Sequence, residues 1–481
     1  MLDQQNTPVG VPLGKPLDEA AVQEFAATFR GELIRPGEDG YDSARVVFNA
    51  MIDRHPALIA RCTGVADVIA AVNFARANEL VVAVRGGGHS VPGYGVCEGG
   101  IVIDLSPMKG ILVDPGARTV RAQAGVTWGE FDRETQQFGL AVTGGRVTHT
   151  GISGLTLGSG SGWLERKYGL TCDNLISAEI VTADGEFLKA SESENEDLFW
   201  GLRGGGGNFG VVTSFEYRLH PVGPIVLGGM LLYPFGRATE LLRFWRDYME
   251  TVPDELGTAP AFITAPPAPF VPEHMQGQIV AGLIVCYAGF PEEGEGWVRP
   301  FREFGPDVDL VQPVPYTVVQ TLLDPGNPPG RNNYWKAENL RELGDEAVST
   351  IVTYAARMTS PFTHVVLQPM GRAISRLGED ETALGGRDAA YALHAISVWE
   401  NPAEPETHIA WTREFLDALQ PFTTPGISLN FTSDQSQDKV KASFGPEKYE
   451  RLVALKNKYD PKNLFRLNQN VKPSANGAAR G

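Results

Sequence analysis

Apolar residues recur at helical spacing along the first part of the chain. In residues 18–30 and 63–78 the apolar positions lie three or four apart, and 128–139 (WGEFDRETQQFG) shows the same amphipathic pattern. Side chains at this spacing share one face of a helix. The pattern predicts surface helices whose buried faces are formed by Val22, Phe25, Ala26 and Phe29 in the first segment and by Val65, Val68, Ile69 and Val72 in the second.

Short apolar runs between these helices predict strands. They include 79–84 (ELVVAV), 99–106 (GGIVIDLS) and 118–126 (RTVRAQAGV), separated by turn sequences such as Asp114-Pro115-Gly116. Residues 178–191 (AEIVTADGEFLKAS) predict a hairpin that turns at Ala183-Asp184-Gly185. The first 223 residues therefore predict an α+β module.

The pattern changes at about residue 224. Longer strand-like runs follow at 223–235, 278–290 and 391–399, together with amphipathic helices at 238–252 and 408–422. The proline-rich segments 259–273 and 324–333 are predicted to be surface loops. A last helix carries Tyr449, Leu452, Val453, Leu455 and Tyr459. A chain of 481 residues is too long for one ordinary core, so two packed domains are expected.

Charge and cysteine content exclude several classes of function. The formal charge of −17 disfavours nucleic acid and anionic lipid as partners. The chain has no 18-residue apolar run that would cross a membrane, and its first twenty residues do not resemble a secretory signal, so a cytoplasmic location is expected. The four cysteines form no C-x-x-C pair, so we expect small core residues and neither a disulfide framework nor a metal site.

Glycines are concentrated in three windows, 86–100, 144–169 and 201–210. Backbone N–H groups in such turns can converge on an anion such as pyrophosphate, and the stretches 85–90 (RGGGHS), 153–162 (SGLTLGSGSG) and 203–210 (RGGGGNFG) each offer a nest of this kind. The alternative for any one window is a tight turn or a bulge. For His89, the alternative is a loop histidine that bonds to the backbone.

The third window contains Gly205-x-Gly207-x-x-Gly210, a spacing typical of Rossmann dinucleotide sites. A Rossmann fingerprint must open a helix, but the residues after it, VVTSFEYRL, alternate as a strand. The motif therefore counts against a Rossmann fold.

Four motifs in order resemble the berberine-bridge-enzyme-like family of FAD-linked oxidases, within the vanillyl-alcohol-oxidase superfamily. They are RGGGHS (85–90), GISGLTLGSGSGWLERKYGLTCDN (151–174), DLFWGLRGGGGNFGVV (197–212) and KYDPKNLFRLNQNVKP (458–473). The resemblance covers residues 40 to 473. It implies an α+β fold: a PCMH-type FAD-binding domain (30–223), a substrate domain with a large antiparallel sheet flanked by helices (224–423), and a C-terminal segment (424–475) that returns to the FAD domain.

The resemblance also assigns roles in cofactor binding. The histidine of the R-G-G-G-H motif, here His89, bonds covalently to the 8α carbon of FAD. Many relatives have a second tether, a cysteine, where this chain has Val147, so a single covalent bond is expected. Cys172 does not replace that cysteine, and packing is its simpler role. The further cofactor-binding positions implied are Arg85, Gly86, Gly87, Gly88, Ser90, Thr148, Gly151, Gly154, Gly158, Gly162, Cys172, Asn174, Gly207, Gly210, Val212, Asn468 and Asn470.

The reaction centre departs from the family pattern. Relatives place tyrosines around the substrate, but this chain has Val91, Ser161 and Ser428 at the usual positions. In the strand 391–399 the position five before Trp399 faces the flavin in relatives, and here it is His394, a candidate catalytic base. The alternative for His394 is a histidine that bonds inside the sheet.

Asn430 and Asn470 are candidates to bind substrate or flavin carbonyls, with Asn430 assigned to the catalytic site. Tyr334 and Trp335 either line the pocket or pack, and packing is favoured.

The leading hypothesis is an oxidase that transfers hydride from a small organic substrate (an alcohol, amine, sugar or secondary metabolite) to FAD and returns the electrons to molecular oxygen as hydrogen peroxide. Two alternatives stay open. One is a dehydrogenase with another electron acceptor, and the other is a flavin-binding protein that has lost catalysis, since three tyrosines are replaced. The sequence leaves the substrate and the oligomeric state undetermined.

Overall fold

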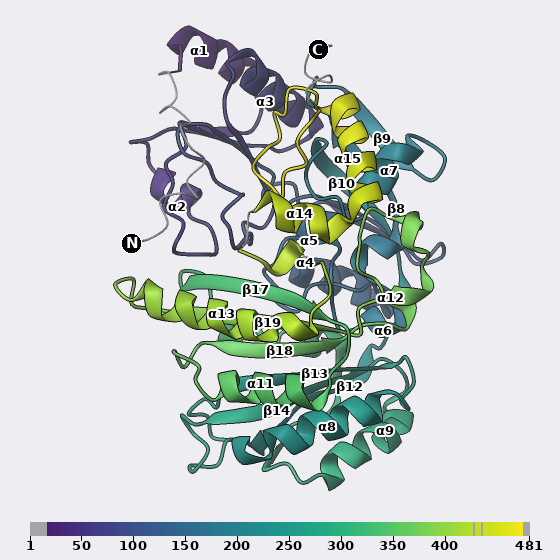
Figure 1. Cartoon of the computed structure of the whole chain (residues 1–481). Helices are drawn as coiled ribbons and strands as arrows, with labels where there is room; N and C mark the ends of the chain where they lie inside the picture. Colours follow the sequence, from purple (N-terminus) through teal and green to yellow (C-terminus); the bar gives the residue numbers. More distant parts are fainter. Residues whose placement is uncertain (1–16, 427–428, 434–435, 475–481) are drawn as a thin grey trace.

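The computed structural model describes residues 17–426, 429–433 and 436–474, and Ser428 lies outside these ranges. Two small sheets with their helices form one end of the molecule in Figure 1, and a large sheet with its helices forms the other. The predicted change at residue 224 falls between β11 (His220–Pro221) and β12 (Ile225–Pro234).

The first small sheet has the order β1-β2-β4-β3. Strands β2, β3 and β4 are parallel, β1 is antiparallel to β2, and α1 and α3 pack against this part of the core. The predicted helices and strands at 18–30, 63–78 and 79–84 are confirmed. The elements are α1 (Glu19–Thr28), β1 (Glu32–Ile34), α2 (Tyr41–Arg45), β2 (Leu58–Arg61), α3 (Val65–Ala77), β3 (Val82–Arg85) and β4 (Ile101–Asp104).

The second small sheet is antiparallel, in the order β5-β6-β10-β8-β9. The predicted hairpin is β8 and β9. The third glycine window leads into strand β10 and opens no helix, so the Rossmann interpretation is excluded as predicted. The elements are β5 (Ile111–Asp114), β6 (Thr119–Gln123), α4 (Trp128–Thr135), η2 (Gln136–Phe138), β7 (Leu140–Ala141), α5 (Ile152–Gly158), α6 (Glu165–Tyr168), η3 (Thr171–Asn174), β8 (Leu175–Val181), β9 (Phe187–Ser191), α7 (Glu196–Leu202) and β10 (Val211–Arg218).

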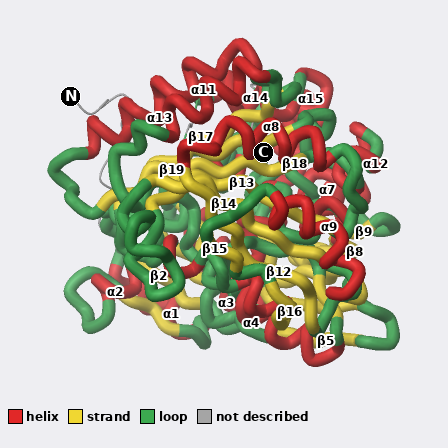
Figure 2. Tube along the Cα trace, turned by 90° about the horizontal axis from the view of Figure 1, so that it is seen from below, coloured by secondary structure: helices red, strands yellow, loops and turns green. Residues whose placement is uncertain are grey.

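The large sheet is antiparallel and runs in the order β15-β12-β14-β13-β18-β19-β17, with β16 paired to β12. The helices α8, α9, α11 and α13 cover one face, as Figures 1 and 2 show from two directions. The opposite face turns toward the small sheets. The strands are β12, β13 (Leu256–Thr264), β14 (Ile279–Tyr287), β15 (Val308–Asp309), β16 (Gln312–Pro315), β17 (Asn332–Leu340), β18 (His364–Pro369) and β19 (Tyr391–Trp399).

The helices and short helical turns of this half connect the strands or pack on the sheet. They are η4 (Phe235–Arg237), α8 (Ala238–Met249), α9 (Pro291–Glu303), α10 (Tyr316–Gln320), η5 (Asp324–Gly326), α11 (Asp345–Ala355), α12 (Ala373–Arg376), η6 (Glu379–Glu381), α13 (Pro405–Leu419) and η7 (Gln420–Phe422).

Two segments differ from the sequence-based prediction. Residues 259–264, predicted to be part of a proline-rich loop, belong to β13 in the middle of the large sheet. Pro260 lies opposite Leu283 in the β13–β14 ladder, whereas the pairing of β13 with β18 involves its neighbours Ala261 and Phe262. The glycine-rich stretch 153–162 is not a loop throughout, because its first half forms helix α5 and the turn begins at Ser159.

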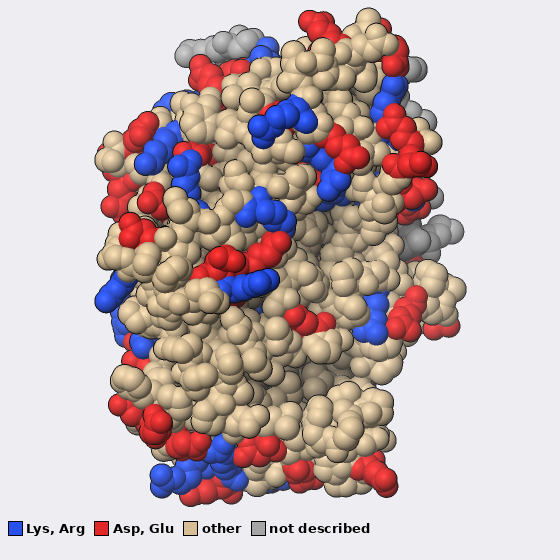
Figure 3. Space-filling model, turned by 180° about the vertical axis from the view of Figure 1, so that it is seen from behind, with Lys and Arg blue, Asp and Glu red and all other residues tan. Residues whose placement is uncertain are grey.

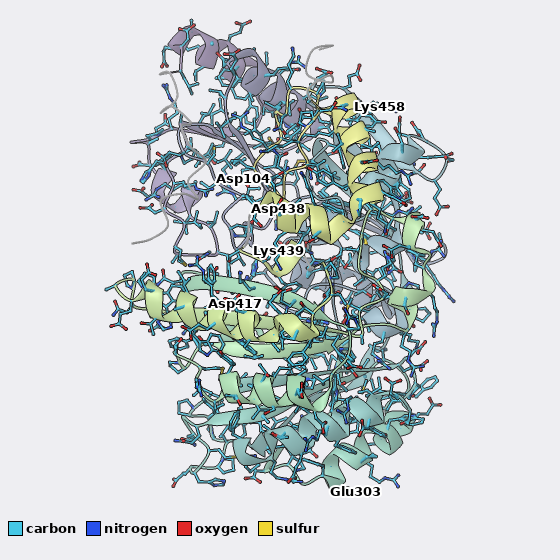
Figure 4. The ribbon with its side chains drawn as sticks, viewed as in Figure 1. Asp104, Glu303, Asp417, Asp438, Lys439 and Lys458 are labelled. Carbon is cyan, nitrogen blue, oxygen red and sulfur yellow. The ribbon has the colours of Figure 1, made fainter. Side chains whose placement is uncertain are left out.

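The C-terminal segment returns to the small sheets after a short turn, η8 (Leu429–Phe431). It forms α14 (Gln437–Phe444) and α15 (Pro446–Tyr459). Figure 4 labels Lys458 on α15, which pairs with Asp197 of α7 at 2.8 Å, and Lys439 on α14, which pairs with Glu338 of β17 at 3.2 Å. This segment therefore contacts both halves of the molecule.

Surface charges, helix lengths and cysteine burial can be compared with the expectations from the sequence. Basic and acidic side chains are mixed over the face seen in Figure 3. No helix within the described ranges is long and apolar enough to cross a membrane. All four cysteines are buried as free thiols, as predicted for core residues.

Candidate active site

A cavity lies between the small sheets and the face of the large sheet that carries no helices. One wall consists of backbone from all three glycine windows, including Gly87, Gly154 and Gly207. The other wall comes from alternate residues of β18 and β19, among them Gln368, His394 and Ile396. Alternate residues of a strand point to the same face, so the neighbouring β19 residues Leu393 and Ala395 face the other way and pack against the helices.

The first two glycine windows meet backbone to backbone. A methyl group on Gly87 would come within 2.6 Å of the Gly151 Cα, so only glycine permits this approach. Arg85, at the end of β3, is opposite Asp104 of β4, and the two buried side chains form an ion pair at 2.8 Å. Asp104 is labelled in Figure 4. This pair fixes the start of the glycine loop at the cavity wall.

His89 follows this loop and lies in a cluster of rings. Phe48 stacks on its imidazole with ring centroids 3.9 Å apart. Its Nε2 lies 3.2 Å from Nδ1 of His149, and Nε2 of His149 lies 3.1 Å from the backbone oxygen of Asn327. Burial, reinforced by the neighbouring His149, lowers the pKa of His89 to about 3. The ring is therefore neutral at physiological pH.

His394 is on the opposite wall and only 2% exposed. Neither ring nitrogen has a hydrogen-bond partner among the described residues. Burial lowers the pKa of His394 to about 3, and the positive charge of Arg146 contributes next. The imidazole is thus neutral at physiological pH. Its two unused nitrogens remain available to a ligand.

A polar chain crosses the cavity beside His394. Glu165 binds Arg146 at 2.9 Å, Arg146 donates to the Ser161 hydroxyl at 2.6 Å, and Ser161 donates to Oε1 of Gln368 at 3.0 Å. Because the Gln368 oxygen is occupied in this way, its amide N–H groups are the donors left for a ligand. The ring of Trp163 lies beneath the Arg146 guanidinium at 4.7 Å.

The C-terminal segment supplies the remaining side of the cavity. Asn430 donates to the Leu155 oxygen at 2.9 Å and lies against Gly158, where a methyl group would come within 2.7 Å of Asn430 Cγ. Asn468 donates to Gly207 at 2.9 Å, and its Oδ1 is buried without a partner among the described residues.

Most of the predicted site residues line this cavity. They are Arg85, Gly86, Gly87, Gly88, His89, Ser90, Gly151, Gly154, Gly158, Gly207, Gly210, Val212, His394, Asn430 and Asn468. Val147, which stands at the position of the second tether in relatives, also lines it.

Five predicted cofactor-binding residues lie outside the lining: Thr148, Gly162, Cys172, Asn174 and Asn470. Each has a local structural reason. Thr148 donates through its backbone nitrogen and its hydroxyl to the Asp324 carboxylate, Gly162 bonds to Glu165, and Asn174 donates to two backbone oxygens of its own turn. Cys172 packs with Leu170 and Ile374, and burial raises the pKa of its thiol. The backbone oxygen of Asn470 accepts from Gln437, whereas its side-chain Oδ1 is buried without a partner among the described residues.

Several cavity residues were not found from the sequence, namely Phe48, Tyr94, Arg146, His149, His364 and Gln368. Tyr94, His364 and Gln368 line the cavity with Arg146, whereas Phe48 and His149 contact His89 directly. The available signal was their position, because Tyr94 lies inside the first glycine window and Arg146 and His149 lie inside the second. Two of the three replaced tyrosine positions, Val91 and Ser161, line the cavity. Trp335, for which packing was favoured, also lines the cavity, and its ring stacks on that of Phe431.

Comparisons with known proteins agree with this architecture. The model of the FAD binding domain matches residues 56–191, and that of "berberine and berberine like" proteins matches 429–472. An FAD-linked oxidoreductase of Dictyostelium discoideum is 32% identical over 461 residues, which cover 95% of this chain and 97% of that relative. The chain belongs to the berberine-bridge-enzyme-like family.

Other members of the family support the assignment. The (R)-6-hydroxynicotine oxidase of Paenarthrobacter nicotinovorans is 30% identical over 462 residues, covering 93% of this chain and 97% of that enzyme. The crystal structure of 6-hydroxy-D-nicotine oxidase from Arthrobacter nicotinovorans superposes with a TM-score of 0.84 at 29% identity, covering 97% of this chain and all of that one. The predicted α+β fold of the vanillyl-alcohol-oxidase type is confirmed.

The chain is therefore an FAD-linked oxidoreductase. The cavity suits this cofactor, because glycine backbone without side chains forms the wall where a long dinucleotide would lie, and buried atoms such as Oδ1 of Asn468 have no partner among the described residues. Histidine, cysteine and acidic side chains gather nowhere in the described ranges in a group able to hold a metal ion.

Proposed function

We propose that this protein is an oxidase that removes hydride from a small organic molecule, with FAD tethered once, through His89, and His394 as the group that receives the substrate proton. The observation that carries the proposal is the position of His394. It is a buried neutral imidazole with two unpartnered nitrogens in the wall opposite the glycine loops.

Bound in this cavity, FAD would supply the two-electron acceptor and pass the electrons on to molecular oxygen. The backbone of Gly86, Gly87 and Gly88 lines the cavity, and its N–H groups would hold the pyrophosphate. A tether at His89 prevents loss of the cofactor. Val147, an aliphatic residue, leaves no second thiol to attach.

His394 can act in spite of its low pKa. The neutral ring first accepts a hydrogen bond from the substrate O–H or N–H group and so orients the adjacent C–H bond. When hydride leaves an alcohol, the remaining hydroxyl becomes that of a protonated carbonyl, which is a stronger acid than the His394 imidazolium. The proton therefore moves to His394 during or directly after hydride transfer.

The Gln368 amide, which Arg146 orients through Ser161, determines which polar groups of a substrate can bind beside His394. The Gln368 amide offers donors, so a substrate oxygen or nitrogen lone pair is matched there. The curated relative at 30% identity is named for oxidation of 6-hydroxynicotine, and we propose small molecules of comparable size as substrates and 6-hydroxynicotine as a first probe.

Anaerobic flavin reduction tests the role of His394. The His394→Ala variant should reduce its flavin about a hundredfold more slowly than wild type, the usual loss when a general base is removed. His408→Ala is a matched control, because His408 is also buried but bonds to Thr359 away from the cavity. An equal rate in wild type and His394→Ala would contradict the proposal.

Peroxide measurement separates an oxidase from a dehydrogenase. With each turnover in air, the oxidase should form one hydrogen peroxide per oxidised substrate, and its bleached flavin should recover its colour on aeration. Flavin that stays reduced in air would identify a dehydrogenase. Flavin that no alcohol, amine or sugar reduces would identify a binding protein.

A further inference from the structure

The environment of His89 determines which of its nitrogens carries the proton. Nε2 of His149 lies 3.1 Å from the backbone oxygen of Asn327. A carbonyl oxygen only accepts, so this nitrogen must carry a hydrogen. In neutral His149, Nδ1 is then the nitrogen with the lone pair.

That lone pair faces His89. The distance from His149 Nδ1 to His89 Nε2 is 3.2 Å, a hydrogen-bond distance, so Nε2 of His89 is the donor. The neutral His89 ring consequently keeps its own lone pair on Nδ1. Phe48 stacks on the ring at 3.9 Å and restrains its plane.

We propose that His149 is the positioning residue and proton acceptor for flavin attachment, so that the covalent bond forms at Nδ1 of His89 while the Nε2 proton passes to His149. The inference rests on the proposed function, in which His89 tethers FAD. It concerns the formation of the tether and is separate from turnover.

The step balances as an addition. A C–H bond of the flavin 8α methyl group and the His89 N–H bond break, and the new bond joins Nδ1 to the 8α carbon. The two hydrogens and the electron pair leave the flavin reduced. Molecular oxygen, the acceptor in the proposed reaction, takes the two electrons and two protons and becomes hydrogen peroxide.

His149 suits this task because a protonated His149 keeps both of its contacts. As an imidazolium it donates from Nε2 to Asn327 and from Nδ1 to Nε2 of His89, which has lost its proton. A residue limited to accepting would lose the contact with His89 at this stage.

The backbone around His149 is held by the other half of the molecule. Asp324 accepts from the Thr148 backbone nitrogen at 2.8 Å and from its hydroxyl at 2.6 Å. Asn327 donates from its side chain to Leu323 at 2.8 Å, which fixes the turn that presents its carbonyl. The contact between Gly87 and Gly151 holds the two loops close enough for His89 and His149 to meet.

The test follows tethering over time. The full-length chain, purified without flavin from riboflavin-limited cells, is mixed with FAD in air, and the covalent fraction is measured by acid precipitation and intact mass. His149→Ala should tether about a hundredfold more slowly than wild type. His149→Gln, which keeps an acceptor but is no base, should fall between them, and it replaces His149→Ala if that variant does not fold.

Two further measurements separate proton transfer from a structural role. Added imidazole should restore part of the rate in His149→Ala, and NMR of the flavin peptide from wild type should show attachment at Nδ1. No rescue in a variant with normal FAD affinity, or attachment at Nε2, would overturn the inference. His408→Ala, which removes a buried histidine far from the cavity, should tether at the wild-type rate.

Failure of the inference and failure of the proposed tether give different results. If wild-type protein releases all its flavin on acid precipitation, the covalent bond in the proposed function is wrong. If wild type and His149→Ala both tether at the same rate, only the role of His149 is wrong.

Discussion

At the scale of single residues, the site depends on buried histidines that are neutral. His89 and His394 are held in that state by burial, each with a pKa lowered to about 3. A neutral ring can both donate and accept, which a charged ring cannot do. The same burial makes these residues sensitive to acid.

The acid sensitivity gives a prediction for His394. Its pKa is about 3 in the folded protein and 6.5 in the unfolded chain, so between these values the unfolded state binds more protons. Below pH 6.5 the free energy of unfolding should therefore fall by about 1.4 kcal/mol per pH unit on account of this residue. Above pH 6.5 the effect vanishes.

Denaturant unfolding at several pH values measures this loss in the free energy of unfolding. The His394→Gln variant should lose less stability than wild type between pH 6.5 and 5. Parallel pH profiles for wild type and His394→Gln would refute the prediction.

At the scale of elements, α15 is fastened at its end by a buried ion pair. Lys456 and Asp460 are both fully buried with 2.7 Å between Nζ and Oδ2. Lys456 also donates to the backbone oxygens of Asn208 and Phe465, and Asp460 accepts from the backbone nitrogens of Leu464 and Phe465. The pair joins the helix to the third glycine window.

Removal of one partner should therefore be costly. Lys456→Met leaves the Asp460 carboxylate buried and unpaired, and we expect a loss of about 3 kcal/mol in the free energy of unfolding. Lys458→Met is the matched control two residues away on the same helix, because the Lys458 side chain is 57% exposed and its pair with Asp197 contributes little. Chemical denaturation of both variants measures the difference.

Helix α5 provides a second prediction at this scale. Asn430 lies against Gly158, so Gly158→Ala must push η8 away from the end of α5. We expect weaker FAD binding in Gly158→Ala, with little change in the control Gly296→Ala, since Gly296 lies on α9 outside the cavity lining and no atom lies within 4 Å of a Cβ there. Titration of flavin fluorescence measures the two affinities, and equal values would show that the contact is unimportant.

The sequence predicted those elements whose pattern is local. Helices α1, α3, α8 and α13 and strands β12, β14 and β19 were found because each carries its own periodicity. Strand β13 was missed because Pro260 and the prolines that follow the strand suggested a loop, and its place in the sheet is set by strands distant in the chain. Helix α5 was missed because its glycines lower helix propensity, while packing against η3 and η8 stabilises it.

The sequence predicted those site residues that lie inside sequence motifs. The resemblance to a family supplied His89 and the glycine loops, but contacts between distant residues could not be read from a single sequence. His149 is 60 positions from His89, and Gln368 is 207 from Ser161. Such pairs become visible only when the two halves are placed together.

At the scale of the whole molecule, Asn49 joins the two halves. Its side chain donates to the backbone oxygens of Val91 at 2.7 Å and Asn333 at 2.9 Å, and accepts from the Asn333 nitrogen at 2.9 Å. Asn49 is only 2% exposed. The segment beside the His89 loop is therefore attached to β17, an edge strand of the large sheet.

The Asn49→Ala variant should lose the hydrogen bonds that attach this segment to β17. Leaving buried backbone groups unpaired costs about 2 kcal/mol, so we expect a lower Tm and faster hydrogen exchange at residues 330–334. Asn78→Ala provides the control, because Asn78 makes its side-chain bond within one half, to Phe74. Unchanged exchange in Asn49→Ala would show that other contacts hold the halves together.

The carbonyl of Asn327 comes from the large-sheet half, yet it sets the hydrogen on a ring beside the glycine loop of the other half. A chain whose second half has not yet docked would leave His149 free to adopt either tautomer. Under the proposed tether, covalent flavin would then form only in molecules that had finished folding, and the covalent fraction left after acid precipitation would be lower in a destabilised variant.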